Sequence, residues 1–359
     1  MSIQLARSGH RVIVLEKEYY PFHRVCGEYI SLESRQYLHS LGYLVEDMNL
    51  PLIKRLQVSA PNGKTIEHPL GLGGFGISRY KMDAELAQLA RRNGVEVQEG
   101  VRVTDAVLYG SSFRISATGG AIAARVVAGC WGKRANLDIK WKRGFAGRKS
   151  GALSNYIGVK YHIKTDIPAD RIALHNFSNG YCGISRVEDD TCCLCYLTTA
   201  QNLRKAGGSI ADMEKSILYR NPLLKTVFTS SAFLWQEPVT IAQISFGKKQ
   251  QVENHVLMIG DSAGMITPLC GNGMSMALHG GKMAAALISR FLHRQITRTQ
   301  MEEEYIRQWK STFDARLRMG RLIQSCFGSD HISNTFISIM KPFPKIVSYL
   351  IQQTHGQPF

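Results

Sequence analysis

Residues 259–281, IGDSAGMITPLCGNGMSMALHGG, combine an acid with glycines in a pattern that can bind a ligand. Asp261 follows an apolar run typical of a buried strand, so its carboxylate is placed to accept hydrogen bonds from hydroxyl groups. Gly271, Asn272 and Gly273 open a helix of small residues, and the amides of a helix N-terminus favour negative charge. The alternative is an ordinary strand and helix joined by a glycine-rich loop.

A second acid, Glu16, ends another apolar run near the start of the chain. Ile3 and Leu5 are at helical spacing, and Val12 to Leu15 predict a buried strand. In a dinucleotide-binding βαβ unit, an acid at the end of the second strand binds ribose hydroxyls. Solvent-facing strand ends also carry glutamate. Glu16 therefore supports a dinucleotide site only in combination with the pattern at residues 259–281.

Four segments resemble known flavoproteins. Residues 259–281 resemble the second FAD fingerprint of the para-hydroxybenzoate-hydroxylase-like flavoproteins, in which a strand runs into Gly-Asp, small residues, Pro and G-x-G at a helix start. HRVCGEYIS (23–31) is similar to a Cys-Gly-Glu segment of the geranylgeranyl-reductase branch, and residues 77–90 to its R-x-x-x-D-x-x-L helix start. Residues 126–138 are similar to a strand-and-glycine segment of the family. The resemblance implies an FAD-dependent oxidoreductase.

The resemblance also assigns roles to residues. Cys26 and Tyr181 are the candidate catalytic groups, and the alternative for Cys26 is a plain packing role, which is the commoner one. Arg79 either lies near the pyrophosphate or ribityl chain of FAD or forms a cap or salt bridge at the surface. The residues expected to bind FAD are Glu16, Lys17, Arg24, Gly27, Glu28, Arg79, Val103, Gly132, Gly260, Asp261, Pro268, Gly271, Asn272, Gly273 and Met274. NAD(P)H is the candidate electron donor.

In these flavoproteins a first strand and a G-x-G-x-x-G turn precede the helix that here begins at Met1. We therefore expect about twenty residues ahead of Met1 to supply the turn. We also expect the chain as given to bind FAD poorly and to leave strand edges unpaired.

Departures from the family bear on the reaction. NGYCGIS keeps Gly180 and Tyr181 of a G-Y-x-W-like stretch of geranylgeranyl reductases but has Gly183 in place of the Trp, which argues against a long prenyl substrate. The W-x-W-x-I-P segment of flavin halogenases is absent, and so is a separate NAD(P)H fingerprint. Two reactions stay open: reduction or dehydrogenation of a hydrophobic, lipid-like or carrier-bound substrate, and O2-dependent hydroxylation. A non-catalytic remnant or binding protein that keeps the fold is the third alternative.

Composition limits the partners. With 44 Lys and Arg against 28 Asp and Glu, the net charge of +16 favours anionic surfaces and ligands. The most basic stretch, residues 132–151, has no repeat, no reading helix and little aromatic interleaving, which argues against nucleic acid. The expected partner is a small hydrophobic substrate, with an anionic membrane or an acyl carrier as a peripheral contact.

The absence of a long apolar stretch and of a signal-peptide layout predicts a cytoplasmic protein, either free or peripheral to a membrane. The cysteines are scattered, and Cys193 and Cys195 would share one face of a strand with no His beside them in the sequence. No metal site is therefore predicted.

The order of elements predicts an α/β protein with a doubly wound FAD domain of the glutathione reductase type 2-like kind and an interleaved mixed β-sheet domain. Residues 1–47, 78–141 and 254–297 are expected to form the FAD domain, 48–77 and 142–253 the substrate domain, and 298–359 a C-terminal helical segment. Asn62-Gly63 predicts a hairpin, and residues 106–132 predict a three-stranded meander. The last amphipathic segment, broken at Pro342 and Pro344, either packs on the body or lies in a bilayer interface.

Overall fold

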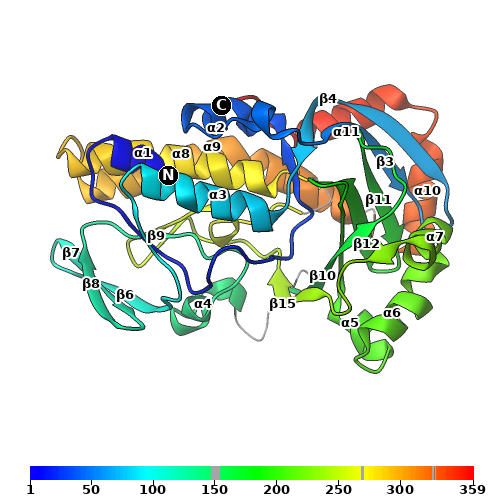
Figure 1. Ribbon diagram of the computed structural model, residues 1–359, viewed down its shortest axis with the longest axis horizontal. Helices are drawn as coiled ribbons and strands as arrows, with labels where there is room; N and C mark the ends of the chain where they lie inside the picture. The colour runs from blue at the N-terminus through cyan, green and yellow to red at the C-terminus, as the bar shows by residue number, and fades with distance from the viewer. Residues whose placement is uncertain (147–153, 268–270, 326, 328) are drawn as a thin grey trace.

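The computed structural model describes residues 1–146, 154–267, 271–325, 327 and 329–359. Figure 1 shows helices above small sheets on the left and a large sheet covered by helices on the right. The long helices α8 (Gly273–Leu292) and α9 (Arg298–Ser325) pack against each other, and α9 extends from the left part toward the right. The predicted α/β class with C-terminal helices is confirmed.

The left part contains two parallel strand pairs. β1 (Ile13–Leu15) pairs with β5 (Glu96–Gln98), and β9 (Ala128–Gly129) pairs with β17 (Val256–Met258), which β16 (Val252–Glu253) also joins. Among the described residues these pairs belong to two separate sheets. Helices α1 (Ser2–Arg7) and α3 (Arg79–Arg92) belong to this part, as does α8.

An antiparallel meander lies below these strands in the view of Figure 1. It consists of β6 (Val103–Tyr109), β7 (Ser112–Ala117) and β8 (Gly120–Ala124). Its turns use Gly110 and Gly119, both with positive φ, a conformation that glycine adopts without strain. The predicted meander is therefore confirmed.

The right part is built on a mixed sheet of nine strands among the described residues. β15 and β14 both pair with β10, followed by β13, β12, β11, β3, β4 and β2. The sheet is mixed because β3 and β11 run parallel. The strands are β2 (Tyr29–Ser31), β3 (Leu52–Ser59), β4 (Thr65–Gly76), β10 (Ser154–Lys164), β11 (Arg171–Phe177), β12 (Gly180–Arg186), β13 (Cys192–Thr199), β14 (Ala232–Phe233) and β15 (Val239–Ser245). The hairpin predicted at Asn62-Gly63 joins β3 to β4.

The register separates the side chains of this sheet into two faces, because neighbours along a strand alternate. One face, with Tyr161, Ile184 and Tyr196, buries a core against the helices that follow β13. The opposite side of the sheet lies against the loop at residues 23–28 and the C-terminal helices. The covering helices are α5 (Ala200–Lys205), α6 (Ile210–Ser216) and α7 (Pro222–Ser230).

The C-terminal segment forms α10 (Asp330–Met340) and α11 (Pro344–Thr354), broken at the two prolines as predicted. Ile337 on its inner side is 2% exposed, so the segment packs on the body. Ile339, Phe343 and Tyr349 on its outer side remain about half exposed. In the described residues no helix combines the length and apolar character that crossing a bilayer requires.

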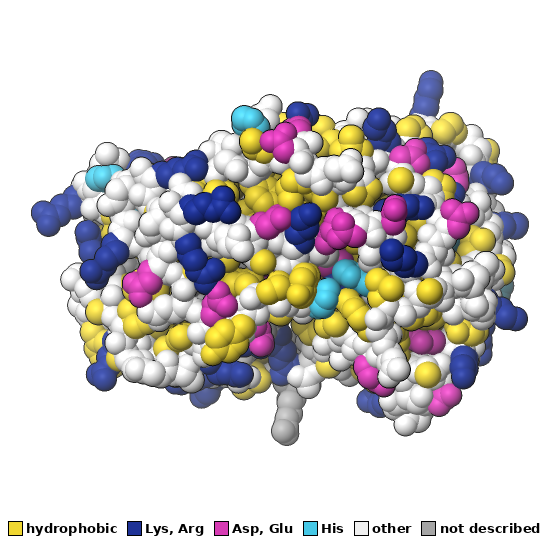
Figure 2. All heavy atoms as spheres, in the orientation of Figure 1, with side chains coloured by type: hydrophobic (Ala, Val, Ile, Leu, Met, Phe, Trp, Pro, Cys, Tyr) yellow, Lys and Arg dark blue, Asp and Glu magenta, His cyan; other side chains and the backbone are white. Residues whose placement is uncertain are grey.

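The remaining short elements connect these parts. They are α2 (Arg35–Ser40), α4 (Asn136–Lys140) and the single-turn helices η1 (Leu32–Ser34), η2 (Val45–Met48), η3 (Gly144–Ala146), η4 (Leu218–Arg220) and η5 (Gly260–Ser262). On the face drawn in Figure 2, Lys and Arg side chains are scattered with acids between them. The positive charge on this face is therefore dispersed and does not form one basic patch.

Candidate functional site

The turn between β17 and α8 brings Asp261 close to the start of the helix. Gly260 has φ of 67°, and a Cβ there would lie 2.9 Å from Cβ of Ala277, so the close approach of turn and helix requires glycine. Asn272 immediately precedes α8 and donates from Nδ2 to Thr354 O at 2.7 Å. Its buried Oδ1 has no hydrogen-bond partner among the residues that the structure describes. Gly273 and Met274 begin the helix, whereas the predicted site residue Pro268 lies outside the described residues.

The buried side-chain amine of Lys249 binds the backbone of this turn. Lys249 donates from Nζ to Asp261 O at 2.6 Å and to Lys133 O at 3.0 Å. Burial lowers the pKa of Lys249 to about 8. The negative charge of Asp261 raises this pKa and offsets only part of the effect of burial. Sequence reasoning missed this lysine because it stands twelve residues before Asp261, in a polar stretch with no pattern of its own.

This pKa predicts a pH effect on stability. Because the unfolded chain holds the Lys249 proton up to about pH 10.5 and the folded chain releases it near pH 8, the free energy of unfolding should rise with pH between these values. The rise should approach at most about 1.4 kcal/mol per pH unit. Urea unfolding at pH 7.5 and 9, compared with Lys249→Met, isolates this residue from thiols that titrate in the same range. Equal pH slopes in the two proteins would refute the prediction.

Glu16 lies at the end of β1, as predicted, inside a network of ion pairs. It accepts from Arg24 at 2.7 Å, and Arg24 Nε lies 3.5 Å from Asp83. Arg79 donates twice to Asp83, at 2.7 and 2.6 Å. Arg79 therefore forms a salt bridge in the free chain, and its predicted place near the pyrophosphate or ribityl chain of FAD stays a prediction. Lys17, whose side chain is half exposed, pairs with Glu18 at 3.0 Å and stays outside this network.

Three predicted residues lie apart from the ion pairs. Val103 begins β6, and Gly132 has φ of 82° with open space above it. Gly27 is exposed and also faces open space. These glycines leave room for a ligand against the backbone.

Glu28 is the centre of a buried charged cluster. Its carboxylate accepts from Lys160 Nζ, from His162 Nε2 at 2.6 Å and from the amide of Arg79 at 2.7 Å. Glu28 is 1% exposed and Lys160 is 0% exposed. Burial alone would raise the pKa of Glu28, but the bond from His162 and the charge of Lys160 hold it below its usual value. Lys160 and His162 are two residues apart on β10, so both point to the same face.

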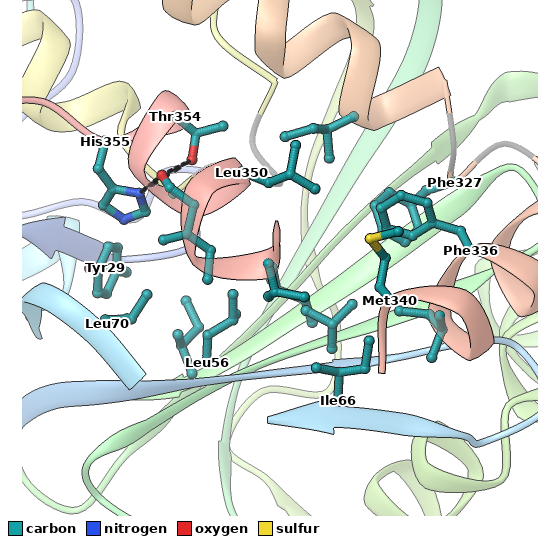
Figure 3. Close-up of a pocket in the computed structure, with 18 residues that line it drawn as sticks. Tyr29, Leu56, Ile66, Leu70, Phe327, Phe336, Met340, Leu350, Thr354 and His355 are labelled. Carbon is teal, nitrogen blue, oxygen red and sulfur yellow. Dashed lines mark hydrogen bonds between the residues drawn. The ribbon is translucent and has the colours of Figure 1, made fainter. Parts of the chain in front are cut away.

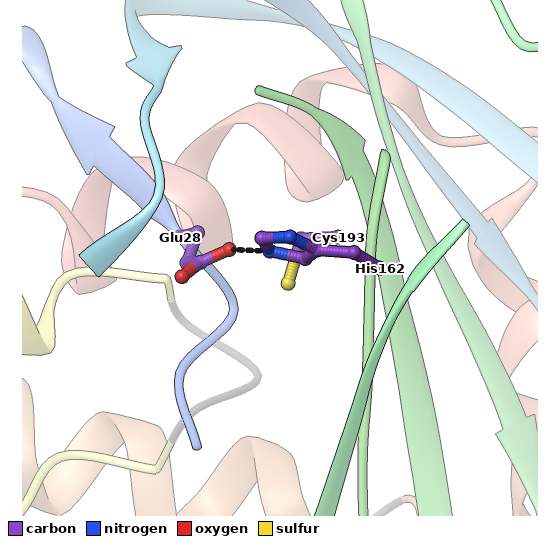
Figure 4. Close-up of side chains that lie close together, drawn as sticks. All are labelled: Glu28, His162 and Cys193. Carbon is purple, nitrogen blue, oxygen red and sulfur yellow. Dashed lines mark hydrogen bonds and ion pairs between the residues drawn. The ribbon is translucent and has the colours of Figure 1, made fainter. Parts of the chain in front are cut away.

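Cys193 also belongs to this cluster (Figure 4). The cluster thus contains a carboxylate, an imidazole and a thiol, which are the donor types of a metal site. The ligand atoms of Glu28, His162 and Cys193 lie within 4.8 Å of one another. No His stands beside this cysteine in the sequence, but sheet pairing places His162 of β10 opposite Cys193 of β13. Two facts argue against a bound cation: Lys160 already occupies the carboxylate, and burial raises the pKa of Cys193 well above its usual value.

The two candidate catalytic residues lie in different surroundings. Cys26 borders the charged cluster, where its Sγ accepts from the amide of Glu28 at 3.5 Å and its carbonyl accepts from Cys193 at 3.2 Å. Tyr181 is buried in an apolar cluster with Leu174 and Phe327. Their catalytic roles stay predictions.

An apolar cavity lies between the large sheet and the C-terminal helices (Figure 3). Its volume is ≈ 130 Å³. The sheet supplies one wall and α9, α10 and α11 supply the other. The lining residues are Tyr29, Leu56, Val58, Ile66, Leu70, Ile172, Leu174, Gly271, Ile323, Phe327, Phe336, Ile337, Met340, Val347, Leu350, Ile351, Thr354 and His355. Gly271 is the predicted site residue that this cavity shares with the start of α8. Sequence reasoning missed the others because the cavity forms only when distant segments pack.

A stretch with the spacing G-x-G-x-x-G does occur in the sequence, at Gly71 to Gly76, but it lies inside strand β4. A dinucleotide-binding turn requires these glycines between a strand and a helix. Here they allow close packing, since a Cβ on Gly74 would collide with the ring of Tyr29 and one on Gly76 with the carbonyl of Arg186. The turn expected ahead of Met1 concerns residues outside the sequence and stays a prediction.

The fold is shared with solved structures of flavin-dependent halogenases and of a reductase-like protein. The flavin-dependent brominase Bmp2 superposes with a TM-score of 0.79 at 20% identity, covering 98% of this chain and 89% of that one. A geranylgeranyl bacteriochlorophyll reductase-like protein from Thermoplasma acidophilum gives 0.77 at 17% identity, covering 100% and 92%. The halogenase PltM, solved with phloroglucinol and FAD, gives 0.74 at 13%, covering 98% and 82%. At these identities the likeness establishes the fold.

The curated relatives that match are longer than this chain. Conditioned medium factor receptor 1 of Dictyostelium discoideum is 24% identical over 354 residues, which cover 88% of this chain and 66% of the relative. Tryptophan 2-halogenase of Chondromyces crocatus is 23% identical over 273 residues, covering 70% and 50%. The chain thus spans about two thirds or half of these relatives. No protein-family model matches it.

Proposed function

We propose that this chain is an FAD-dependent oxidoreductase that acts on a small hydrophobic molecule. The observation that carries the proposal is the position of Gly271, which belongs to the glycine stretch that opens α8 and also lines the apolar cavity. A ring bound at the N-terminus of α8 would therefore border a space suited to an apolar substrate. When bound, the flavin supplies electron-pair transfer, and the protein supplies binding and orientation.

The residues around the turn fit an isoalloxazine ring and its ribityl chain. A Cβ on Gly27 or on Gly132 would meet no atom within 4 Å, so a planar group has room against both backbones. In the described part of the chain, Oδ1 of Asn272 is a buried acceptor without a donor, as expected where a ligand completes the hydrogen bonding. The carboxylate of Asp261 would accept from ribityl hydroxyls, and the first amides of α8 would stabilise negative charge on the ring.

The other end of FAD would meet the ion-pair network. Glu16 would accept from the ribose hydroxyls, and Arg24 and Arg79 would bind the diphosphate. Both arginines already pair with Asp83, so the diphosphate has to compete with that carboxylate. This internal pairing favours the alternative of a binding protein that keeps the fold without the cofactor.

The buried walls perform the remaining tasks. Leu56, Leu174 and Phe336 exclude water from the cavity, which protects reactive groups and strengthens electrostatic interactions there. The cluster around Glu28 fixes the loop that carries Cys26 and Gly27 against β10. NAD(P)H is the proposed electron donor.

Oxygen uptake separates the two reactions. FAD-loaded protein is reduced with NADPH and mixed with 4-ethylphenol in air, or with cinnamaldehyde under nitrogen. Oxygen uptake stimulated by the phenol supports hydroxylation, whereas reoxidation of the flavin by the alkene supports reduction. A protein whose flavin responds to neither molecule, or that takes up no FAD, would contradict the proposal and support the binding protein.

A further inference from the structure

The hydroxyl of Tyr29 is a buried polar group without a partner in the cavity wall. Tyr29 lies on β2 and is 5% exposed, and its Oη has no hydrogen-bond partner within the described part of the chain. Its ring packs between Gly74 and Gly271. Burial, together with the negative charge of Glu33, raises the pKa of Tyr29, so the hydroxyl stays protonated and can donate.

The rest of the cavity offers this hydroxyl little. Figure 3 places Tyr29, Thr354 and His355 at one end and Phe327, Phe336 and Met340 at the other. Thr354 donates from Oγ1 to Ile351 O at 2.8 Å, and Nδ1 of His355 lies 2.9 Å from the same carbonyl. Oγ1 of Thr354 and Nδ1 of His355 are thus engaged within α11 and its end.

Buried hydroxyls in native proteins are nearly always hydrogen-bonded, and each exception calls for an explanation. The ring of Tyr29 is fixed by two glycines, so the hydroxyl cannot swing out to solvent without disturbing β4 and the start of α8. A ligand oxygen bound at the Tyr29 end of the cavity would supply the missing acceptor.

The volume limits what such a ligand is. An engineered apolar cavity of about 150 Å³ in another protein binds benzene, and the present cavity measures ≈ 130 Å³. One ring, or a chain of similar size, therefore fills it.

We propose that Tyr29 Oη donates a hydrogen bond to the substrate, and that this substrate is an apolar molecule about the size of one ring that carries a carbonyl or hydroxyl oxygen. The inference rests on the proposed function and narrows its substrate class. Because Tyr29 contacts Gly271, the hydrogen bond would hold the oxygen-bearing end of the molecule beside the start of α8. Tyr29 is thus a positioning residue that decides which end of the substrate faces the flavin site.

The test uses two probes of matched shape, acetophenone and ethylbenzene, which differ chiefly in the carbonyl oxygen. Their dissociation constants are measured by calorimetry on the full chain without FAD, so that failure of flavin binding does not affect the result. Tyr29→Phe should weaken acetophenone about tenfold and leave ethylbenzene unchanged. Tyr43→Phe, which removes a hydroxyl bonded to Glu85 outside the cavity, should leave both constants unchanged.

Thermal unfolding checks the variant itself. Since Tyr29→Phe removes a hydroxyl that has no partner, the variant should unfold at the same temperature as the parent chain or above it. An unchanged acetophenone constant in Tyr29→Phe, an equal weakening of both probes, or no binding of either probe to the parent chain would overturn the proposal. Loss of flavin binding alone would contradict the oxidoreductase and leave this result intact.

Discussion

Replacing Glu28 by alanine is expected to lower the free energy of unfolding by about 3–5 kcal/mol, as is typical when one partner of a buried ion pair is removed. Lys160 is 0% exposed and donates to Glu28, so the variant leaves an ammonium group in the protein interior without its counter-charge. His162 and the amide of Arg79 lose their acceptor as well. Chemical denaturation of the FAD-free chain measures the effect.

Two further variants isolate the cause. The double variant Glu28→Ala/Lys160→Met removes both charges and should recover most of the loss, because a buried apolar side chain has no charge to desolvate. Glu18→Ala removes a carboxylate from the exposed pair with Lys17 and should change stability by less than about 1 kcal/mol. A loss of under about 1 kcal/mol in Glu28→Ala, or no recovery in the double variant, would show that the buried pair does not stabilise the loop at residues 23–28.

Replacing Gly27 by valine is expected to weaken FAD binding on the order of 100-fold while leaving the fold intact, equivalent to about 2.7 kcal/mol. A Cβ at this position meets no atom within 4 Å, so the free protein accommodates the side chain. The same space is where the ring would approach the backbone. The loop continues to Tyr29, whose ring contacts Gly271, so Gly27 lies close in sequence to the cavity edge. Titration of FAD fluorescence measures affinity, and thermal unfolding checks the fold.

Gly71→Val is the matched control. Gly71 also faces open space, but it lies on β4 away from the turn after β17, so its variant should bind FAD like the parent chain. If Gly27→Val binds FAD as tightly as Gly71→Val does, the ring does not pass over Gly27. If both variants lose affinity together, a general effect on the fold replaces the local one.

Local patterns predicted the elements well. Asn62-Gly63 marked the β3–β4 hairpin, Gly110 and Gly119 marked the turns of the meander, and the two prolines marked the break between α10 and α11. Each of these signals acts over a few residues, because a turn or a helix end is set by the φ angle or the missing amide of one residue. Glu16 directly follows β1, and Asp261 lies in η5 shortly after β17, so the apolar runs before them located both acids approximately.

The charged cluster and the cavity could not be predicted in the same way. Glu28 and Lys160 are 132 residues apart, and only the packing of the loop on β10 brings them together. The alternation of Lys160 and His162 would have shown that two basic side chains share a face, but not which acid meets them. Tyr29 stood in a segment chosen for Cys26 and Glu28, and its unpaired hydroxyl appears only when β4 and the start of α8 close around its ring.

The most direct test of the flavin assignment is a crystal structure of the chain grown with saturating FAD. We expect the isoalloxazine at the turn after β17, with the first amides of α8 at its pyrimidine edge, Asp261 on the ribityl chain and Gly271 between the ring and the apolar cavity. Side chains filling that space, the cofactor bound elsewhere, or no FAD at saturating concentration would contradict the account.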